Sequence, residues 1–281
     1  MTAVIDIGSN SVRLGYPVRG IVTAKKINTT ALAEGLTASG FLSPAALQRT
    51  AAAVEAYADE ARAADATDIK VFATEAVRSA ANGGEIIAEV KRLCGLDVVV
   101  LSQEQEARAA YLGAADGLKE ATVIDIGGGS AEIICGYGGE IVYAESFPLG
   151  AVRLKEACDN DRAALDKYIA RYIKDGIPCI TPIIGVGGTA TSQYVIKENP
   201  SVYSAQEVHN QIISAAELRQ ITDKLFEMTP EQITQKYPLI SPRRAAVLPS
   251  GAYLLCKLLQ KTGADKLTIS ELDNMEGFLL L

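Results

Sequence analysis

The chain of 281 residues contains a single histidine, His209, and five cysteines with no C-x-x-C pair. Structural zinc sites and disulfide frameworks both need several such residues at regular spacing, so neither is expected here. The cysteines are instead expected to be small buried hydrophobic residues. They are Cys94, Cys135, Cys158, Cys179 and Cys256.

The sequence also lacks a long hydrophobic run and an excess of positive charge. No apolar stretch approaches the roughly 18 residues that span a bilayer, and no basic segment followed by a hydrophobic signal segment opens the chain. We therefore expect a cytoplasmic protein without a membrane partner. Net charge is −7, from 27 Lys and Arg against 34 Asp and Glu. Nucleic-acid binding needs many phosphate-neutralising cations, so a nucleic-acid partner is not expected, and a polyanionic substrate would need a divalent metal or a local basic patch.

One eight-residue segment of the chain is repeated. Residues 4–11 read VIDIGSNS and residues 123–130 read VIDIGGGS, which agree at six of eight positions. Each copy begins with a short apolar run typical of a strand buried on both faces, and then turns on small residues. Because glycine permits positive φ, successive N–H groups of such a turn can surround an anion. A single copy could merely close a turn, but duplication favours two similar halves.

An aspartate lies near the end of each repeated strand. Asp6 and Asp125 each offer a hard oxygen ligand, which suits a Mg²⁺ ion that bridges to phosphate oxygens. Two such hairpins facing each other would form a clamp for a phosphoryl group. A third segment, residues 183–190 (IIGVGGTA), has the same apolar run and glycine turn but no acid, so it is expected to touch a ligand without holding a metal.

Local patterns along the chain predict an α/β protein of two domains. Strands are expected at residues 21–23, 70–73, 98–101 (buried), 122–127, 133–134, 141–143, 182–186 and 266–269. Helices are expected after an N-cap at Ser43, at residues 84–93, at 103–118 after a capping box of Ser102 and Gln105, near 161–174, at 214–228, at 242–261 and from 273. The first domain would cover residues 1–117, completed by a closing helix at 273–281, and the second residues 118–272.

A set of short segments resembles one family as a group. They are residues 6–14 (DIGSNSVRL), 34–36 (EGL) with Gly40 and 42–43, 73–78 (ATEAVR), 106–108 with 112–113, 125–130 with Glu132, and 185–189 (GVGGT). Together they resemble the exopolyphosphatase and guanosine pentaphosphate phosphatase family of the actin-like and sugar-kinase superfold. The resemblance implies two similar actin-like (ribonuclease H-like) domains, each a mixed sheet with flanking helices, and an active site in the cleft between them. With one histidine, this would be a short form without the histidine-aspartate domain of longer relatives.

The resemblance implies roles for the matching positions. Family members hydrolyse a terminal phosphoanhydride without forming a phospho-enzyme. Glu106 would be the general base that activates water, and Arg78 would contact phosphate. Mg²⁺ would be held by Asp6, Asp125 and Glu132, and phosphoryl oxygens by Ser9, Asn10, Ser11, Gly128, Gly129 and Ser130.

Simpler interpretations remain open for several of these residues. Glu106 could merely stabilise a helix dipole from the first turn, and Glu132 could be an ordinary outward-facing strand residue. Arg13 and Arg108 are interpreted as structural or surface cations, and His209 as a surface or packing residue.

The chain departs from the family pattern at six positions. Ala31 and Met275 stand where relatives carry Arg, Gln103 and Gln105 replace Gly and Glu, Asn210 replaces Gly, and Ala246 replaces Asp. Losing cations weakens the case for gripping a long polyanion, so short polyphosphate chains are favoured.

The sequence thus leads to Mg²⁺-dependent hydrolysis of terminal phosphoanhydride bonds of inorganic polyphosphate. Three alternatives remain: a 5′-phosphatase of guanosine pentaphosphate, an ATP-dependent kinase or ATPase with Gly187 and Gly188 near adenosine, and a non-catalytic sensor of a phosphorylated nucleotide. A homodimer is compatible with the resemblance, because relatives are often dimers.

Overall fold

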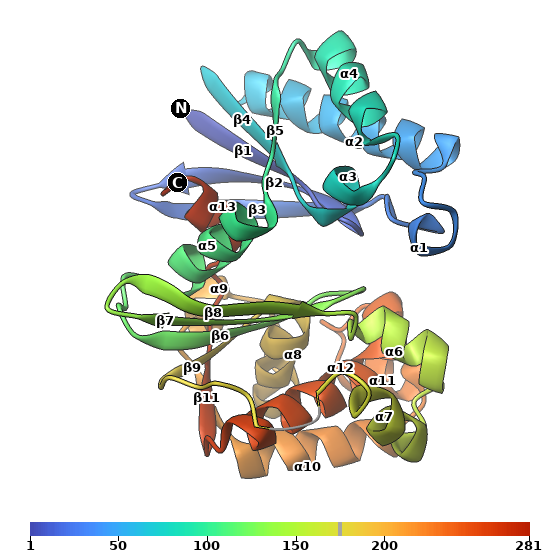
Figure 1. Ribbon diagram of the computed structural model, residues 1–281, viewed down its shortest axis with the longest axis vertical. Coiled ribbons are helices and arrows are strands. Elements are labelled where there is room, and N and C mark those ends of the chain that lie inside the picture. Colours follow the sequence, from blue (N-terminus) through green and yellow to red (C-terminus); the bar gives the residue numbers. More distant parts are fainter. Residues whose placement is uncertain (174–175) are drawn as a thin grey trace. The chain divides into compact units, whose positions relative to one another are not determined.

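The structure, a computed structural model, describes residues 1–173 and 176–281 and divides the chain into two compact units (Figure 1). Unit 1 comprises Met1–Ala109 together with Asn274–Leu281, and unit 2 comprises Ala110–Asp273. Each unit contains one mixed sheet with helices packed against it, which confirms the predicted α/β fold.

Unit 1 is built on a five-stranded sheet with the order β3-β2-β1-β4-β5. The first three strands form an antiparallel meander, and the last two run parallel to β1. Their bounds are β1 Thr2–Ile7, β2 Ser11–Val18, β3 Ile21–Thr29, β4 Asp68–Ala73 and β5 Val98–Val100. Strand β1 is buried along nearly its whole length, as the apolar run predicts for a central strand.

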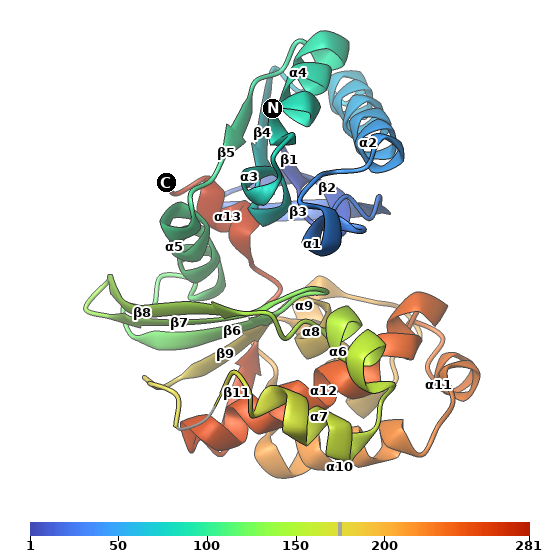
Figure 2. The same cartoon turned by 45° about the vertical axis from the view of Figure 1, so that its right-hand side comes forward.

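Helices cover both faces of this sheet (Figures 1 and 2). Helices α2 (Pro44–Ala63) and α4 (Gly83–Cys94) lie side by side over one face, which carries Ile5 and Val71. The predicted N-cap of α2 is confirmed, because Ser43 Oγ accepts a hydrogen bond from Ala46 N at 3.2 Å. Two short helices, α1 (Leu36–Ser39) and α3 (Glu75–Ser79), lie in the connections.

The opposite face of the sheet receives helices α5 (Gln103–Ala114) and α13 (Asn274–Phe278). Val4 and Phe72 pack there against Ala109 and Met275. Met275 is fully buried in this cluster, so an apolar side chain fits the position where relatives carry Arg.

Two expectations for this unit are wrong in detail. Strand β5 is not buried, because it is an edge strand in which Val99 is 48% exposed. Helix α5 ends at Ala114 rather than 118, since Asp116 and Gly117 take left-handed φ values of 47° and 82° that no helix continues through.

Unit 2 contains a six-stranded sheet with the order β10-β11-β9-β6-β7-β8. The antiparallel meander of β6, β7 and β8 at one side of this sheet repeats that of unit 1. The bounds are β6 Ala121–Ile126, β7 Ala131–Tyr137, β8 Glu140–Phe147, β9 Ile183–Val186, β10 Ile212–Ser214 and β11 Lys266–Ile269. Strands β9 and β11 run parallel to β6, and β10 runs antiparallel to β11.

The helices of this unit surround two apolar clusters (Figure 2). They are α6 Ala151–Cys158, α7 Arg162–Ile169, α8 Gly187–Glu198, α9 Ala205–Val208, α10 Ala215–Phe226, α11 Pro230–Lys236 and α12 Pro242–Thr262. The larger cluster lies against the sheet, whereas Ile233 of α11 lies in the smaller one with residues of α8, α10 and α12. The expected helices at 214–228 and 242–261 are confirmed, whereas α6, α8, α9, α11 and β10 were not predicted. The helix expected near 161–174 is observed as α7 and ends at Ile169. Residue 174, the last of the expected range, lies outside the described residues. In the described part of the chain, no helix has the length and apolarity that a membrane crossing requires.

The closing helix α13 is tied to unit 1 by a buried carboxylate. Glu276 is 3% exposed, accepts a hydrogen bond from Val22 N at 3.0 Å and forms an ion pair with Lys25 at 3.0 Å. Gly277 lies so close to α5 that a Cβ there would be 1.7 Å from Ala109 O. Helix α13 is therefore part of the unit 1 core.

Replacing Glu276 with Ala is expected to lower the free energy of unfolding by about 3 kcal/mol, because the ammonium of Lys25 and the N–H of Val22 lose a buried acceptor. Urea unfolding followed by circular dichroism measures the loss. Lys26→Ala is the control. Lys26 lies next to Lys25 on strand β3 but forms an exposed ion pair with Glu60, so its replacement should change the free energy of unfolding little. Equal losses in the two variants would contradict the assignment.

Candidate functional site

The two repeated segments form turns with the same backbone hydrogen bond. In the first turn (residues 8–11), Gly8 N–H donates to Ser11 O at 3.0 Å. In the second turn (residues 127–130), Gly127 N–H donates to Ser130 O at 2.9 Å. Each turn joins a buried central strand to its antiparallel neighbour, so the sequence repeat is also a structural repeat.

In the first turn, the backbone carbonyl groups are bound by the protein itself. Ser9 O accepts from Ala33 N at 2.8 Å, and Asn10 O accepts from Thr30 N and Ala31 N at 3.0 and 2.9 Å. Ala31, which replaces an Arg of relatives, adopts a φ of 49° to make this contact. The loop after β3 thus holds the turn from behind with backbone atoms alone.

In the second turn, the donors to the backbone carbonyls come from the start of helix α6. Gly127 O and Gly128 O accept from Ala151 N and Val152 N at 2.9 Å, and Gly129 O accepts from Arg153 Nε at 2.9 Å. Within the described residues, the N–H groups of Gly128 and Gly129 have no acceptor. With its carbonyls directed into the protein, the turn presents backbone donors, which is the arrangement that binds an anion.

Two of the three predicted metal ligands, Asp6 and Asp125, differ in what faces them. Asp6 lies opposite Arg13 in the strand register, and Arg13 Nε and Nη2 contact Asp6 Oδ2 at 2.8 and 2.6 Å. Asp125 lies opposite Glu132 at the same step of the repeat. The first repeat is therefore charge-neutral at this position and the second is acidic.

The interpretation of Arg13 as a structural cation fits its contacts. Besides Asp6, its guanidinium binds Asn274 Oδ1 at 2.5 Å, which links strand β2 to the closing helix. The sequence alone gave no signal that this arginine would neutralise a predicted metal ligand.

Asp125 and Glu132 form a pair of like charges across two strands. Residues directly opposite in an antiparallel pair point to the same face with Cβ atoms roughly 5 Å apart, and like charges there are destabilising. Both side chains are only partly exposed, and Glu132 Oε1 accepts from Ser146 Oγ at 2.7 Å. Two carboxylates held together in this way are suited to a hard divalent cation.

The third glycine turn (Gly187 and Gly188) reaches this acidic pair. Gly187 has a φ of 77°, and a Cβ there would lie 2.8 Å from Asp125 Oδ1. Thr189 Oγ1 donates to Ile126 O at 3.4 Å, which fixes the start of α8 against strand β6. Glycine is thus required at 187 both by its conformation and by its contact with Asp125.

Two residues beside the third glycine turn were missed by the sequence argument. The Arg244 guanidinium lies over Gly188, where a Cβ would be 2.5 Å from Nη2. Tyr203 donates to Glu271, and burial together with that carboxylate raises the pKa of Tyr203, so its phenol stays neutral. In the sequence, the segment around Arg244 stands out only by Ala246, which replaces an Asp of relatives, and Tyr203 carries no local signal.

Glu106 and Arg78 are brought together by the fold. Arg78 Nη1 contacts Glu106 Oε2 at 2.7 Å and Leu101 O at 2.6 Å, and the two side chains are 28% and 27% exposed. Helix α5 starts with the predicted capping box, because Ser102 Oγ accepts from Gln105 N and Gln105 Oε1 accepts from Ser102 N. Gln105 therefore has a structural function here.

His209 has a packing role. Its Nδ1 accepts from Glu271 N at 3.3 Å, and its Nε2 lies 3.8 Å from Asp116 Oδ2. The following residue, Asn210, has a φ of 66°, which explains the glycine of relatives, since Asn also tolerates this conformation.

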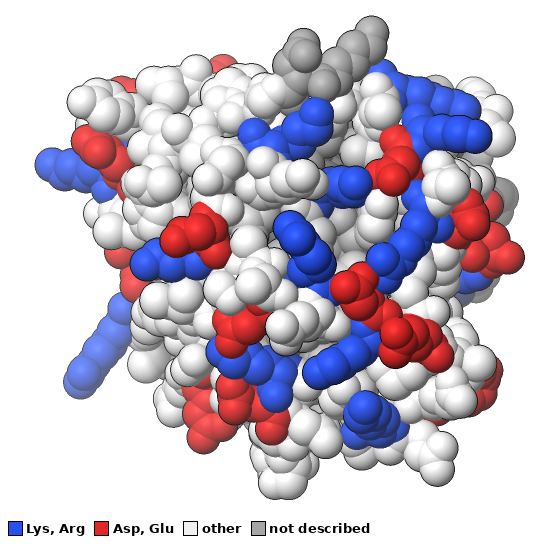
Figure 3. Space-filling view, turned by 90° about the horizontal axis from the view of Figure 1, so that it is seen from below, with Lys and Arg blue, Asp and Glu red and all other residues white. Residues whose placement is uncertain are grey.

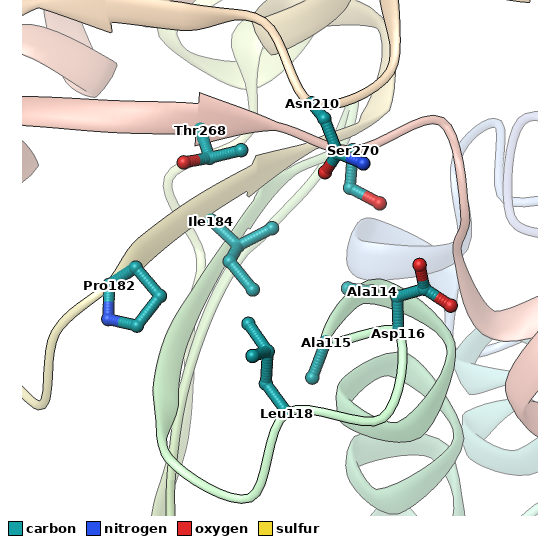
Figure 4. Close-up of a pocket in the computed structure, with 9 residues that line it drawn as sticks. All are labelled: Ala114, Ala115, Asp116, Leu118, Pro182, Ile184, Asn210, Thr268 and Ser270. Carbon is teal, nitrogen blue, oxygen red and sulfur yellow. The ribbon is translucent and has the colours of Figure 1, made fainter. Parts of the chain in front are cut away.

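A shallow cavity of about 230 Å³ lies in unit 2 away from the acidic pair and the glycine turns (Figure 4). The side chains of Ile184 and Leu118 point toward each other across the cavity, and Asp116 and Ser270 lie at one side. None of the residues predicted for the site lines this cavity. Within residues 1–173 and 176–281, no cluster of three or more His, Cys, Asp or Glu side chains is placed to hold a metal ion.

Lysine and arginine side chains lie beside acidic side chains at several places on the face shown in Figure 3, with uncharged surface between them. Binding of a polyanion would therefore depend on local donors and cations, as the net charge of −7 implies.

Comparison with known proteins decides the family. The model of the Ppx/GppA phosphatase family matches residues 19–280. This chain belongs to the Ppx/GppA phosphatase family. The predicted family membership and its hydrolase class are thereby confirmed.

Individual relatives agree with this membership. Exopolyphosphatase 2 of Mycobacterium tuberculosis is 29% identical over 311 residues, which cover 99% of this chain and 97% of the relative. The crystal structure of a Ppx/GppA family member from Aquifex aeolicus is 30% identical, with a TM-score of 0.84 over 99% of this chain and 96% of that chain. An exopolyphosphatase structure from Cytophaga hutchinsonii, 21% identical with a TM-score of 0.82, covers 99% of this chain and 96% of its own and shares the fold.

The third glycine turn gives a matched pair of variants. Gly187→Ala should lower the free energy of unfolding by about 1–3 kcal/mol, because its positive φ and the contact with Asp125 Oδ1 both resist a side chain. Gly188→Ala should cost less, because the end of a flexible side chain, Arg244, can move aside. Urea unfolding measures both, and a Gly188→Ala loss as large as that of Gly187→Ala would refute the close approach to Asp125.

Proposed function

We propose that this protein hydrolyses terminal phosphoanhydride bonds of inorganic polyphosphate, with a preference for short chains. The observation that carries the proposal is the repeated turn whose carbonyls are bound by the protein, next to the Asp125 and Glu132 pair. The name of the M. tuberculosis relative, an exopolyphosphatase, supports the choice of substrate.

The donor set fits Mg²⁺. This ion keeps several waters and is usually bound by one or two carboxylates together with substrate phosphates, so a complete protein cage is not required. Asp125 and Glu132 would hold the ion, and Asp6, already paired with Arg13, would act through water. When bound, the ion would neutralise charge on the phosphoryl oxygens.

The two turns would bind the phosphoryl group. Ser9, Asn10 and Ser11 supply backbone and side-chain donors in unit 1, and Gly128, Gly129 and Ser130 supply them in unit 2. Because the carbonyls of these turns are already hydrogen-bonded to the protein, the backbone donors need no rearrangement when charge develops on the phosphoryl oxygens.

Glu106 would orient the attacking water and accept its proton, without a phospho-enzyme. Arg78 fixes the Glu106 carboxylate through Oε2, and the Leu101 carbonyl in turn fixes Arg78. A positioned general base of this kind contributes roughly 100- to 10,000-fold to a rate.

Two observations favour short chains. Ala31 offers no cation beside the first turn, and the arginines Arg13 and Arg78 are both engaged by acidic side chains. Either arginine would have to break its ion pair to bind a long polyanion.

Hydrolysis of guanosine pentaphosphate is the second candidate. Arg244 and the neutral phenol of Tyr203 beside Gly188 provide a cation and a hydroxyl that could meet a second phosphate or a ribose. Phosphate release from guanosine pentaphosphate, compared with tripolyphosphate at equal concentration, separates the two candidates.

The role of Glu106 is tested by Glu106→Gln with Glu104→Gln as control. Both residues lie in the first turn of α5, so both variants remove the same helix-dipole interaction. Glu106→Gln should lower kcat for phosphate release from tripolyphosphate at least about 100-fold, whereas Glu104→Gln should stay near the wild-type rate. Similar rates for the two variants would leave Glu106 only a structural role.

The metal site is tested by Asp125→Asn and Glu132→Gln. A chelator should abolish phosphate release, and each variant should raise the Mg²⁺ concentration for half-maximal activity at least about tenfold, because a ligand charge is lost. Glu140→Gln, an exposed acid at the start of β8, is the matched control. An unchanged Mg²⁺ requirement in both site variants would exclude the proposed pair.

A further inference from the structure

An acidic residue, Glu75, lies beside the first turn. Ser9 Oγ donates to Glu75 Oε2 at 3.2 Å, and Ser79 Oγ donates to Glu75 Oε1 at 3.1 Å. Glu75 is the first residue of α3, which follows strand β4 next to β1 in the sheet. Its exposed carboxylate is thus held at both oxygens beside the turn proposed to bind phosphate.

The hydrogen bond from Ser9 sets up a competition. A serine hydroxyl has one proton to donate, and in this structure Glu75 receives it. Phosphoryl oxygens of a polyphosphate are acceptors, so a phosphate that takes the Ser9 hydrogen bond must take it from Glu75. The second turn has no such competition, because Gly128 stands where the first turn has Ser9.

Glu75 also determines the local charge. The acids and cations of the unit 1 site cancel in pairs, since Asp6 binds Arg13 and Glu106 binds Arg78. Among the described residues, Glu75 has only the hydroxyls of Ser9 and Ser79 as side-chain partners, which leaves one negative charge next to the turn. A bare polyanion approaching Ser9 is repelled by this charge, whereas a cation between carboxylate and phosphate would attract both.

We propose that Glu75 is a specificity-determining residue that makes the first turn reject metal-free polyphosphate and accept the complex of polyphosphate with a divalent cation. This rests on the proposed function, because it assumes that the first turn binds phosphate. It deepens that function by naming the form of the substrate.

A purely structural role for Glu75 predicts a different result. If the carboxylate only braced Ser79 and the start of α3, its loss would weaken binding of every ligand form by the same factor. A change in the ratio of two affinities is therefore the readout that separates the two roles.

The experiment measures tripolyphosphate binding to the full-length protein by calorimetry, once with chelator and once with saturating Mg²⁺. The variant is Glu75→Gln, which keeps the shape and an acceptor oxygen but removes the charge. The control is Glu85→Gln, an exposed acid in the first turn of α4. Metal-free tripolyphosphate should bind Glu75→Gln at least about tenfold more tightly than wild type, while the Mg²⁺ complex gains little or loses affinity.

Phosphate release by the same proteins separates this inference from the proposed function. If wild type hydrolyses tripolyphosphate but Glu75→Gln keeps the wild-type ratio of affinities, the inference is overturned alone. If wild type discriminates through Glu75 but releases no phosphate, only the proposed hydrolysis fails. If wild type binds neither form of tripolyphosphate, both are wrong. If Glu85→Gln shifted the ratio of the affinities for metal-free and Mg²⁺-bound tripolyphosphate as much as Glu75→Gln does, the effect would come from net charge alone. That result would also overturn the inference.

Discussion

The constraint on which the site depends is the direction of a few backbone carbonyls. A glycine-rich turn binds an anion only if its N–H groups point outward, and this requires that its carbonyls find donors inside the protein. The loop after β3 provides those donors in unit 1, and the start of α6 provides them in unit 2. Different elements thus donate to the turn carbonyls in the two repeats. The two turns therefore share a backbone arrangement although the elements around them differ.

The repeat is not symmetric in charge, and the asymmetry follows from one position. Seven residues after the aspartate, the first copy has Arg13 and the second has Glu132, and the strand register places each opposite its aspartate. In unit 1, Arg13 pairs with Asp6 and links strand β2 to Asn274, whereas in unit 2 two acidic side chains lie opposite each other. The two repeats thus share a backbone frame but differ in charge at this position.

The sequence predicted the parts of the fold that local patterns specify. The buried β1, the N-cap at Ser43 and the capping box at Ser102 were all found, because strand periodicity and capping chemistry act within a few residues. Contacts that depend on tertiary placement were not found. Nothing local indicates that Arg78 binds Glu106, that Glu75 receives the Ser9 hydroxyl, or that β5 is an exposed edge strand. The roles of the site residues themselves remain predictions.

The pairing of charges also constrains how such a site can work. Arginines that hold carboxylates in place are not available as strong phosphate clamps without breaking those ion pairs. A site built in this way gains precise orientation of Glu106 and Asp6 but gives up cationic attraction, and the protein's net charge of −7 does not restore it. Under the proposed function, backbone donors and a metal ion would therefore supply most of the stabilisation of a phosphoryl group at the first turn. A substrate that arrives with its charge partly neutralised would suit such a site, and this is the property that Glu75 is proposed to select.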